Sequence, residues 1–225
     1  MKCLKMDLDN EVTKLKMLEA NYKSNRYRLE DKIAKTYPEE IAKLEKLIEA
    51  VKKDISSIEP QGDGENKFTS ITINGAKITD KKEAGEKLLE AIKTVKVNES
   101  KVIGKYRNMD LEVSYNFFTN EHNFSLNGAS KTIGELGTSA DGNITRFDNA
   151  LEKMPDKLKR LEEKLISTKE QLENAKEELK KPFEKADELK TKVLRLAELN
   201  KLLDMGEVEE KENPNPLVKA AHRLR

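Results

Sequence analysis

The feature that most constrains this chain is a seven-residue repeat of apolar side chains in its C-terminal half. Spacings of three and four alternate along it, and a stripe of mean spacing 3.5 keeps one side of a helix against a partner helix. We therefore predict a second stalk helix over 144–205, with kinks near 155 and 182, because proline removes a helical hydrogen bond. The stripe contains Ile144, Phe147, Leu151, Met154, Leu158, Leu161, Leu165, Thr168, Leu172, Ala175, Leu179, Ala186, Leu189, Val193, Leu196 and Leu203, with Pro182 and Asn200 in two of its slots.

A matching stripe lies in the N-terminal quarter of the chain. It predicts a first stalk helix over 1–59, with a break near Pro38 and an end at Glu59-Pro60. Two such helices bury their stripes most simply by pairing antiparallel within one chain, although each could instead pair with a second chain. The regular part consists of Ile41, Leu44, Ile48, Val51, Ile55 and Ile58, and Leu8, Val12, Leu15, Leu18, Tyr22, Leu29, Ile33 and Tyr37 precede it less regularly.

The segment between the two stripes, 60–143, has a different composition. It holds nine of the ten glycines and six of the eleven aromatic residues. Alternating apolar residues and an Asn74-Gly75 turn predict strands, and Asp80 begins a predicted helix. The predicted fold class is α+β: a long antiparallel helical hairpin, or coiled-coil stalk, with an inserted head of four to five mostly antiparallel strands and one helix. The predicted strands are FTSITI, AKIT, SKVIGKYR, DLEVSYNFF and HNFSLNG, and 206–225 is predicted to be a flexible tail.

Charge and cysteine content exclude several classes of protein. Charged residues make up 38% of the chain, but 43 basic residues face 42 acidic ones, so the net charge is only +1. Bulk charge therefore excludes a strongly basic nucleic-acid binder, and the single cysteine, Cys3, excludes a disulfide-stapled domain. There is no apolar run long enough for a membrane span and no signal-peptide core, so we expect a cytoplasmic protein without a membrane partner.

Motifs for catalysis are missing from the sequence. The chain has no phosphate-binding glycine loop, and its two histidines lack partners at metal-ligand spacing. We therefore expect no catalytic, cofactor-binding or metal-binding residues, no cofactor and no enzyme activity; an independent enzyme would need a cluster formed only in three dimensions.

Two groups of residues are candidates for contact with nucleic acid: basic and aromatic side chains on a strand can stack on bases and pair with phosphates, and a basic cluster on a helix could contact phosphates or an acidic partner. Against this, 60–143 holds 11 basic and 12 acidic residues, and the helical group equally fits a solvated helix face. The first group, on a predicted strand of the head, is Lys101, Lys105, Tyr106 and Arg107; the second, on the first helix, is Lys23, Arg26 and Arg28.

Two long strings carry a resemblance to a known family. FTSITINGAKITDKKEAGEKLLEAI and RLEEKLISTKEQLENAKEELKKPFEKADELKTKVLRLAELNKLLDMGE resemble the C-terminal region of large helicase/DNA-methylase proteins, with SNF2-type helicase and N6-adenine methylase parts, from Gram-positive conjugative transposons. The similarity runs from about Tyr22 to about Glu207, and KPF at 181–183 and LAELNKLL at 196–203 are its most distinctive pieces. The helicase and methylase motifs of that family do not occur here, so no catalytic residue is carried over.

The resemblance implies a role with the DNA of a mobile genetic element. Our first hypothesis is a non-catalytic coiled-coil module that positions a helicase/methylase. Its partners would be the helicase/methylase catalytic domains or another protein, and a homodimer is a further expectation. The alternative is an accessory DNA-binding domain that contacts phosphates through the head sheet and basic helix faces.

Overall fold

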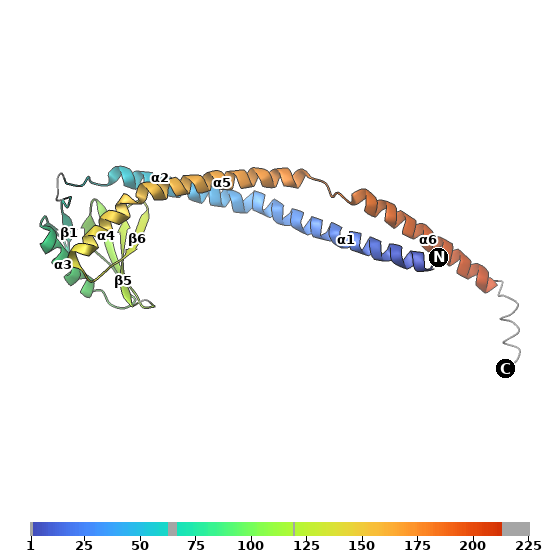
Figure 1. The fold of residues 1–225 in the computed structure, drawn as a ribbon, viewed down its shortest axis with the longest axis horizontal. Coiled ribbons are helices and arrows are strands. Elements are labelled where there is room, and N and C mark those ends of the chain that lie inside the picture. Colours follow the sequence, from blue (N-terminus) through green and yellow to red (C-terminus); the bar gives the residue numbers. More distant parts are fainter. Residues whose placement is uncertain (1, 63–66, 119, 213–225) are drawn as a thin grey trace, which may run out of the picture. The chain divides into compact units, whose positions relative to one another are not determined.

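The computed structural model describes residues 2–62, 67–118 and 120–212, and its elements are labelled in Figure 1. The chain divides into two compact units. The sheet unit is Pro38–Glu170, and the helical unit combines Met1–Tyr37 with Gln171–Arg225. The predicted α+β class, with an antiparallel sheet inserted between long helices, is confirmed. The sheet unit is larger than the predicted head, 60–143, because the flanking helices share its core.

The sheet has six strands in the order β2-β1-β3-β4-β5-β6, and every neighbouring pair is antiparallel. Asn74 and Gly75 join the first two strands with positive φ angles of 48° and 86°, as the predicted hairpin requires. Our prediction of four to five strands missed β6, because its core-facing positions are Thr132 and Gly134 rather than apolar residues. The strands are β1 (Ile71–Ile73), β2 (Ala76–Ile78), β3 (Ser100–Tyr106), β4 (Met109–Asn116), β5 (Glu121–Asn127) and β6 (Lys131–Glu135).

Two helices pack side by side on one face of this sheet, α3 (Lys81–Lys93) and α4 (Ala140–Glu152) (Figure 1). The Asp80 side chain caps α3 by accepting from the Glu83 N–H at 2.8 Å, as predicted. A Cβ at Gly85 would lie 2.8 Å from the Ala140 Cβ, so the glycine permits this close approach. The single predicted head helix was an undercount, because α4 belongs to the sheet as well as to the seven-residue stripe.

The core of the sheet unit therefore contains the first part of the stripe. Phe147 is fully buried, and its ring lies 4.6 Å from that of Phe124 and 5.6 Å from that of Tyr106. Ile144, Leu151 and Met154 are buried in the same cluster. Each large buried side chain contributes about 1.5–3 kcal/mol, so α4 stabilises the sheet as well as extending the helical part of the chain.

Beyond the sheet, α2 (Tyr37–Ser57) pairs with α5 (Met154–Lys180). Leu44, Ile48 and Val51 are buried as the N-terminal stripe predicts. Ion pairs join the helices, among them Lys52–Glu162 at 2.7 Å and Lys169–Glu45 at 2.8 Å. Lys52 follows Glu45 along α2, whereas its partner Glu162 precedes Lys169 along α5. The two helices therefore pair antiparallel within one chain.

A buried carboxylate connects α2 to the turn between β5 and β6. Asp54 is only 2% exposed and accepts from the backbone N–H groups of Ala129 at 2.6 Å and Ser130 at 2.7 Å. The Ser130 hydroxyl donates to it as well, at 2.5 Å. A Cβ at Gly128 would lie 2.2 Å from the Asp54 Oδ1, so this turn needs glycine.

In the helical unit, α1 (Lys2–Asp31) packs against α6 (Ala186–Glu212). Val12 and Leu15 of α1 are buried as predicted, but Leu18 is 44% exposed. On α6 the predicted positions Leu189, Leu196, Asn200 and Leu203 are half-buried, but Val193 is 37% exposed and the buried residue is Leu199, which lies outside the predicted stripe. The helix α6 is separate from α5 rather than its continuation.

The prolines act in three different ways. Pro38 does not break its helix; a π-helical segment, η1 (Lys32–Thr36), precedes it, and its wider turn accommodates the missing donor. Pro155 lies in the first turn of α5, just after α4 ends. Pro182 lies in a break over 181–185 rather than a kink, and α6 then continues past the predicted end at 205 to Glu212. The remainder of the predicted tail lies outside the described residues.

Candidate functional site

The four basic and aromatic residues predicted on the head do not form one patch. Tyr106 is only 2% exposed, and its hydroxyl donates to the Asp148 carboxylate at 2.7 Å. Burial, followed by this hydrogen bond, raises the pKa of Tyr106 far above its usual value. A ring in this position cannot stack on a base, so the structure contradicts that predicted role.

Arg107 also has a structural role. Its Nε donates to the Glu59 carbonyl at 2.7 Å, and its guanidinium lies 3.6 Å from Asp148, with 10% of the side chain exposed. Lys105 is 65% exposed and pairs with Asp110 at 3.4 Å. Lys101 is exposed near the start of β3. Only the two lysines are accessible to a ligand.

The cations predicted on the first helix lie on α1 of the helical unit. Lys23 pairs with Glu19 at 2.7 Å, and Arg26 pairs with Glu30 at 3.3 Å. Arg28 is exposed. Pairs four residues apart on one helix are the expected arrangement of a solvated face, which favours the alternative interpretation given above.

Beside this cluster, Tyr22 makes a contact that periodicity alone did not predict. Its hydroxyl donates to the Lys181 carbonyl at 2.7 Å, and its ring lies 5.4 Å from that of Phe183. The last carbonyls of a helix lack helical partners, so Tyr22 satisfies one where α5 ends. The KPF string that distinguishes the resemblance lies at this contact.

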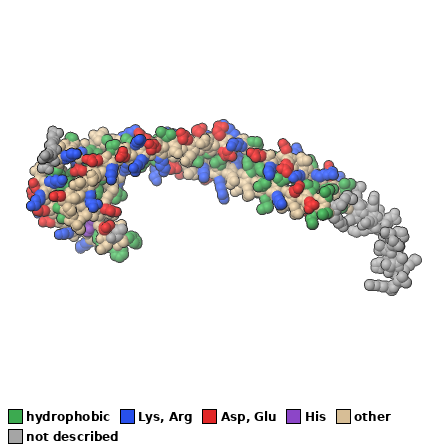
Figure 2. Space-filling view, viewed as in Figure 1, with side chains coloured by type: hydrophobic (Ala, Val, Ile, Leu, Met, Phe, Trp, Pro, Cys, Tyr) green, Lys and Arg blue, Asp and Glu red, His purple; other side chains and the backbone are tan. Residues whose placement is uncertain are grey.

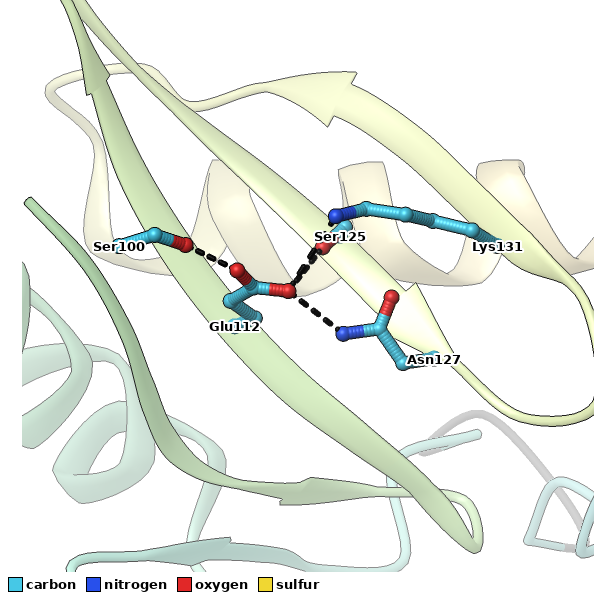
Figure 3. Close-up of polar contacts among 5 residues, drawn as sticks. All are labelled: Ser100, Glu112, Ser125, Asn127 and Lys131. Carbon is cyan, nitrogen blue, oxygen red and sulfur yellow. Dashed lines mark hydrogen bonds and ion pairs between the residues drawn. The ribbon is translucent and has the colours of Figure 1, made fainter.

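The sheet face opposite α3 and α4 carries a polar cluster around Glu112 (Figure 3). Its carboxylate accepts from Asn127 at 2.7 Å, Ser125 at 3.2 Å, Lys131 at 3.3 Å and the Ser100 hydroxyl. The hydrogen bonds donated by Ser100 and then Asn127 lower the pKa of Glu112 to about 2. A carboxylate held ionised in this way is suited to connecting β3, β4, β5 and β6 rather than to exchanging a proton at neutral pH.

One edge of the sheet is formed by β6, which pairs only with β5. The Leu136 N–H donates to the His122 carbonyl at 2.8 Å, so the even-numbered residues of β6 point their backbone groups toward β5. By the alternation of an antiparallel pair, Lys131, Ile133 and Glu135 point theirs toward the free edge. Two of the edge-facing carbonyl oxygens accept hydrogen bonds from side chains: Lys157 donates to Lys131 O at 3.0 Å, and Arg146 donates to Glu135 O at 3.4 Å.

Along this edge runs a groove of about 690 Å³ between β6 and helices α4 and α5, which we call the β6 groove. Five of its lining residues are basic and two are acidic, an excess of three positive charges. The Thr132 Oγ1 on its β6 side is buried and has no hydrogen-bond partner among the described residues. The basic residues are Arg146, Lys153, Lys157, Arg160 and Lys164, and the acidic ones are Glu135 and Asp156.

At the tip of the β4–β5 hairpin, two phenylalanines are exposed. Phe117 is 66% exposed and Phe118 is 97% exposed, with ring centroids 6.3 Å apart. The Asn116 side chain accepts from the Phe118 N–H at 3.0 Å, which fixes the backbone at the start of the turn. Sequence alternation had placed Phe117 on the strand, but β4 ends at Asn116, so both rings project from the turn. We call this pair the Phe tip.

The described residues contain no group of three or more His, Cys, Asp or Glu side chains placed to hold a metal ion. Within the same residues, no helix combines the length and the apolar character that crossing a membrane requires. A comparison of the chain with protein-family models, curated proteins and solved structures found no match. The resemblance to helicase/methylase proteins therefore stays a prediction.

Proposed function

We propose that this chain is a non-catalytic interaction module that positions a helicase/methylase of a mobile genetic element in the cytoplasm. The observation that carries the proposal is the Phe tip, where the Phe118 ring is 97% exposed beside Phe117. Large apolar side chains gathered on a surface mark sites of interaction, and aromatic side chains are frequent among the residues that dominate binding energy.

The support of the tip also favours this role. The β4–β5 hairpin that carries it continues into the sheet core, where Phe124 and Val113 face one another and are buried. A rigid support lowers the entropy lost when a partner orders the contact residues. The rings are therefore held ready for a partner rather than folded onto the sheet.

The test is binding to the catalytic part of a helicase/methylase of the resembling family from which its own C-terminal region has been removed. We expect isothermal titration calorimetry to detect a complex, and replacing Phe117 and Phe118 together with Ser to weaken it by at least about tenfold. Val97→Ser is the matched control, because Val97 is 52% exposed and lies outside the tip. If the native chain forms no complex, the proposal is overturned. If the double substitution leaves the complex intact, the Phe tip is not the binding site.

The second candidate function is DNA binding through the accessible cations of the sheet unit. The exposure of Lys101 and Lys105 favours it. Against it, acidic and basic side chains intermingle over the helices in Figure 2. Phosphate contacts weaken steeply as salt rises, so fluorescence anisotropy with labelled single-stranded and duplex DNA tests this candidate. Absence of binding at low salt, where phosphate contacts are strongest, would exclude it.

A second copy of the chain is a further candidate partner, because the helical unit leaves apolar side chains on both α1 and α6 exposed. Leu4 is 58% exposed, Met6 63%, Leu194 58% and Leu202 54%. Sedimentation equilibrium decides between monomer and homodimer. A monomer mass at every concentration would exclude this partner.

A further inference from the structure

The free edge of β6 presents backbone N–H and C=O groups that an added strand could pair with. Ile133 lies between Lys131 and Glu135, and its N–H and C=O both point away from β5. Within the described part of the chain, no hydrogen bond reaches Ile133 from the edge side. An unpaired edge is a template for pairing with an added strand.

The groove along this edge has a charge that selects among added strands. Lys153 and Arg160 line it and are exposed, whereas Lys164 is paired with Glu40 at 2.8 Å. With five basic residues against two acidic ones, it favours a segment rich in Asp or Glu and disfavours a basic one.

The contacts already made to the edge occupy the places that an added strand would take. Lys157 donates to the Lys131 carbonyl, and Arg146 donates to the Glu135 carbonyl at the longer distance of 3.4 Å. Backbone N–H groups of an incoming strand can replace both cations at these carbonyls. The released cations would then be free to pair with its acidic side chains.

We propose that the β6 groove binds an acidic, extended peptide segment of a partner protein, which adds to the sheet as a seventh strand beside β6. The inference rests on the proposed interaction function and names the chemistry of one partner segment. A peptide fits better than a nucleic-acid backbone, because the edge presents alternating donors and acceptors, whereas phosphates offer only acceptors. The exposed Ile133 side chain, 65% accessible, adds an apolar contact for alternate residues of the segment.

The test uses the full chain and a fluorescein-labelled decapeptide that alternates Glu and Val. We expect anisotropy to report saturable binding that weakens with salt, and no binding of a peptide that alternates Lys and Val. Two further Glu–Val peptides carry N-methyl groups on alternate backbone nitrogens, one on the odd-numbered and one on the even-numbered residues. In one of these two methylated registers the methyl groups replace the N–H groups that face the β6 edge. That version should bind at least about tenfold more weakly.

The variants change the groove without changing the core. We expect Lys153→Glu combined with Arg160→Glu to weaken peptide binding by at least about tenfold, since each like charge opposes an acidic ligand. Lys159→Glu is the matched control, because Lys159 is exposed on α5 but does not line the groove. Ile133→Pro removes one edge-facing N–H and should weaken binding while leaving the β5–β6 pairing intact.

Three results would overturn the inference: no binding of the Glu–Val peptide, equal binding of both methylated registers, or a charge-reversal variant that behaves like Lys159→Glu. Binding of a labelled single-stranded oligonucleotide in place of the peptide would overturn it too, and would assign the groove to phosphates. Calorimetry with the helicase/methylase catalytic part separates the two proposals. If that protein binds the chain but the peptide does not, the groove inference fails and the interaction function stands; if neither binds, both fail.

Discussion

The sheet unit and the helical unit are built from the same kind of amphipathic helix but bury it very differently. In the sheet unit, Phe124 and Phe147 are at most 2% exposed and lie in one continuous core. In the helical unit, the buried apolar side chains are few, among them Val12, Leu15 and Leu199, while other large ones are exposed. A seven-residue stripe therefore predicts helical pairing but does not predict how much of the stripe is buried.

The difference follows from the number of partners that each helix meets. In the sheet unit, α4 packs on both a sheet and a neighbouring helix, so its apolar side is enclosed. In the helical unit, α1 packs against α6 and contacts the end of α5 through Tyr22, and this helical packing leaves much of the apolar surface open. We therefore expect the sheet unit to be the more stable and the helical unit to open more readily.

The largest effect is expected from Phe147→Ala in the sheet core. Removing this ring leaves a cavity beside Tyr106 and Phe124 and should lower the free energy of unfolding by about 3–5 kcal/mol. Urea unfolding followed by circular dichroism measures the change. Phe118→Ala removes an equal volume from an exposed position and should cost less than about 0.5 kcal/mol. Equal losses in the two variants would contradict the core assignment.

A smaller effect is expected from Leu199→Ala in the helical unit. Leu199 is 4% exposed, but α1 and α6 can close around the gap, so we expect a loss of about 2 kcal/mol, at the low end for Leu→Ala. Hydrogen exchange should lose protection on α1 and α6 and keep it on β4 and β5. Leu194→Ala, at a position 58% exposed, is the control. Equal loss of protection on the strands would show that the two units unfold as one.

Glu112 should make the sheet unit sensitive to acid. Its pKa is lowered from 4.5 to about 2, so the folded state favours the ionised form. This stabilisation is complete above the unfolded-state value and is lost as the pH falls toward about 2. We expect the melting temperature of Glu112→Gln to fall less between pH 5 and pH 2, roughly the window of this titration, than that of the native chain. Glu121→Gln, an exposed change on β5, should behave like the native chain.

The smallest effect is expected from the ion pair between Lys169 and Glu45. Both side chains are about half exposed, and the pair joins α5 to α2 at 2.8 Å. A double-mutant cycle with alanine should give a coupling energy of about 0.2–1 kcal/mol that vanishes in 1 M salt, where the screening length is roughly 3 Å. A coupling that persists in high salt would mean that the pair is not simply a surface contact.

Much of the fold could be predicted because the signals were local. The apolar stripes, the Asn74-Gly75 turn and the Asp80 cap each depend on a few neighbouring residues. The strand β6 could not be recognised, since its pairing with β5 uses Thr132 and Gly134 on the core side. The burial of Leu199 was not predicted either, because this residue lies beside the stripe and is buried where α6 packs against α1.

The candidate sites were harder to predict, since they combine distant segments. The β6 groove joins residues 132–135 to residues 146–164. One signal was present: Lys153, Lys157, Arg160 and Lys164 recur at spacings of four, three and four beside the apolar stripe. The pattern alone does not distinguish a groove wall from a solvated helix face. Tyr106 shows the opposite error, because a strand aromatic was assigned to the surface although its partner, Asp148, comes 42 residues later.

The Asp54 contact has a consequence for the order in which the chain folds during synthesis. Its donors, Ala129 and Ser130, follow it by 75 and 76 residues. The carboxylate of a completed α2 must therefore stay in water until the β5–β6 turn has been made, and the sheet core remains open until Phe147 arrives. The strands β3 to β6, which pair with their sequence neighbours, can assemble first, because short loops close at low entropic cost. A nascent chain stopped before α4 would consequently expose both the apolar stripe of α2 and the part of the sheet face that α4 covers in the finished fold.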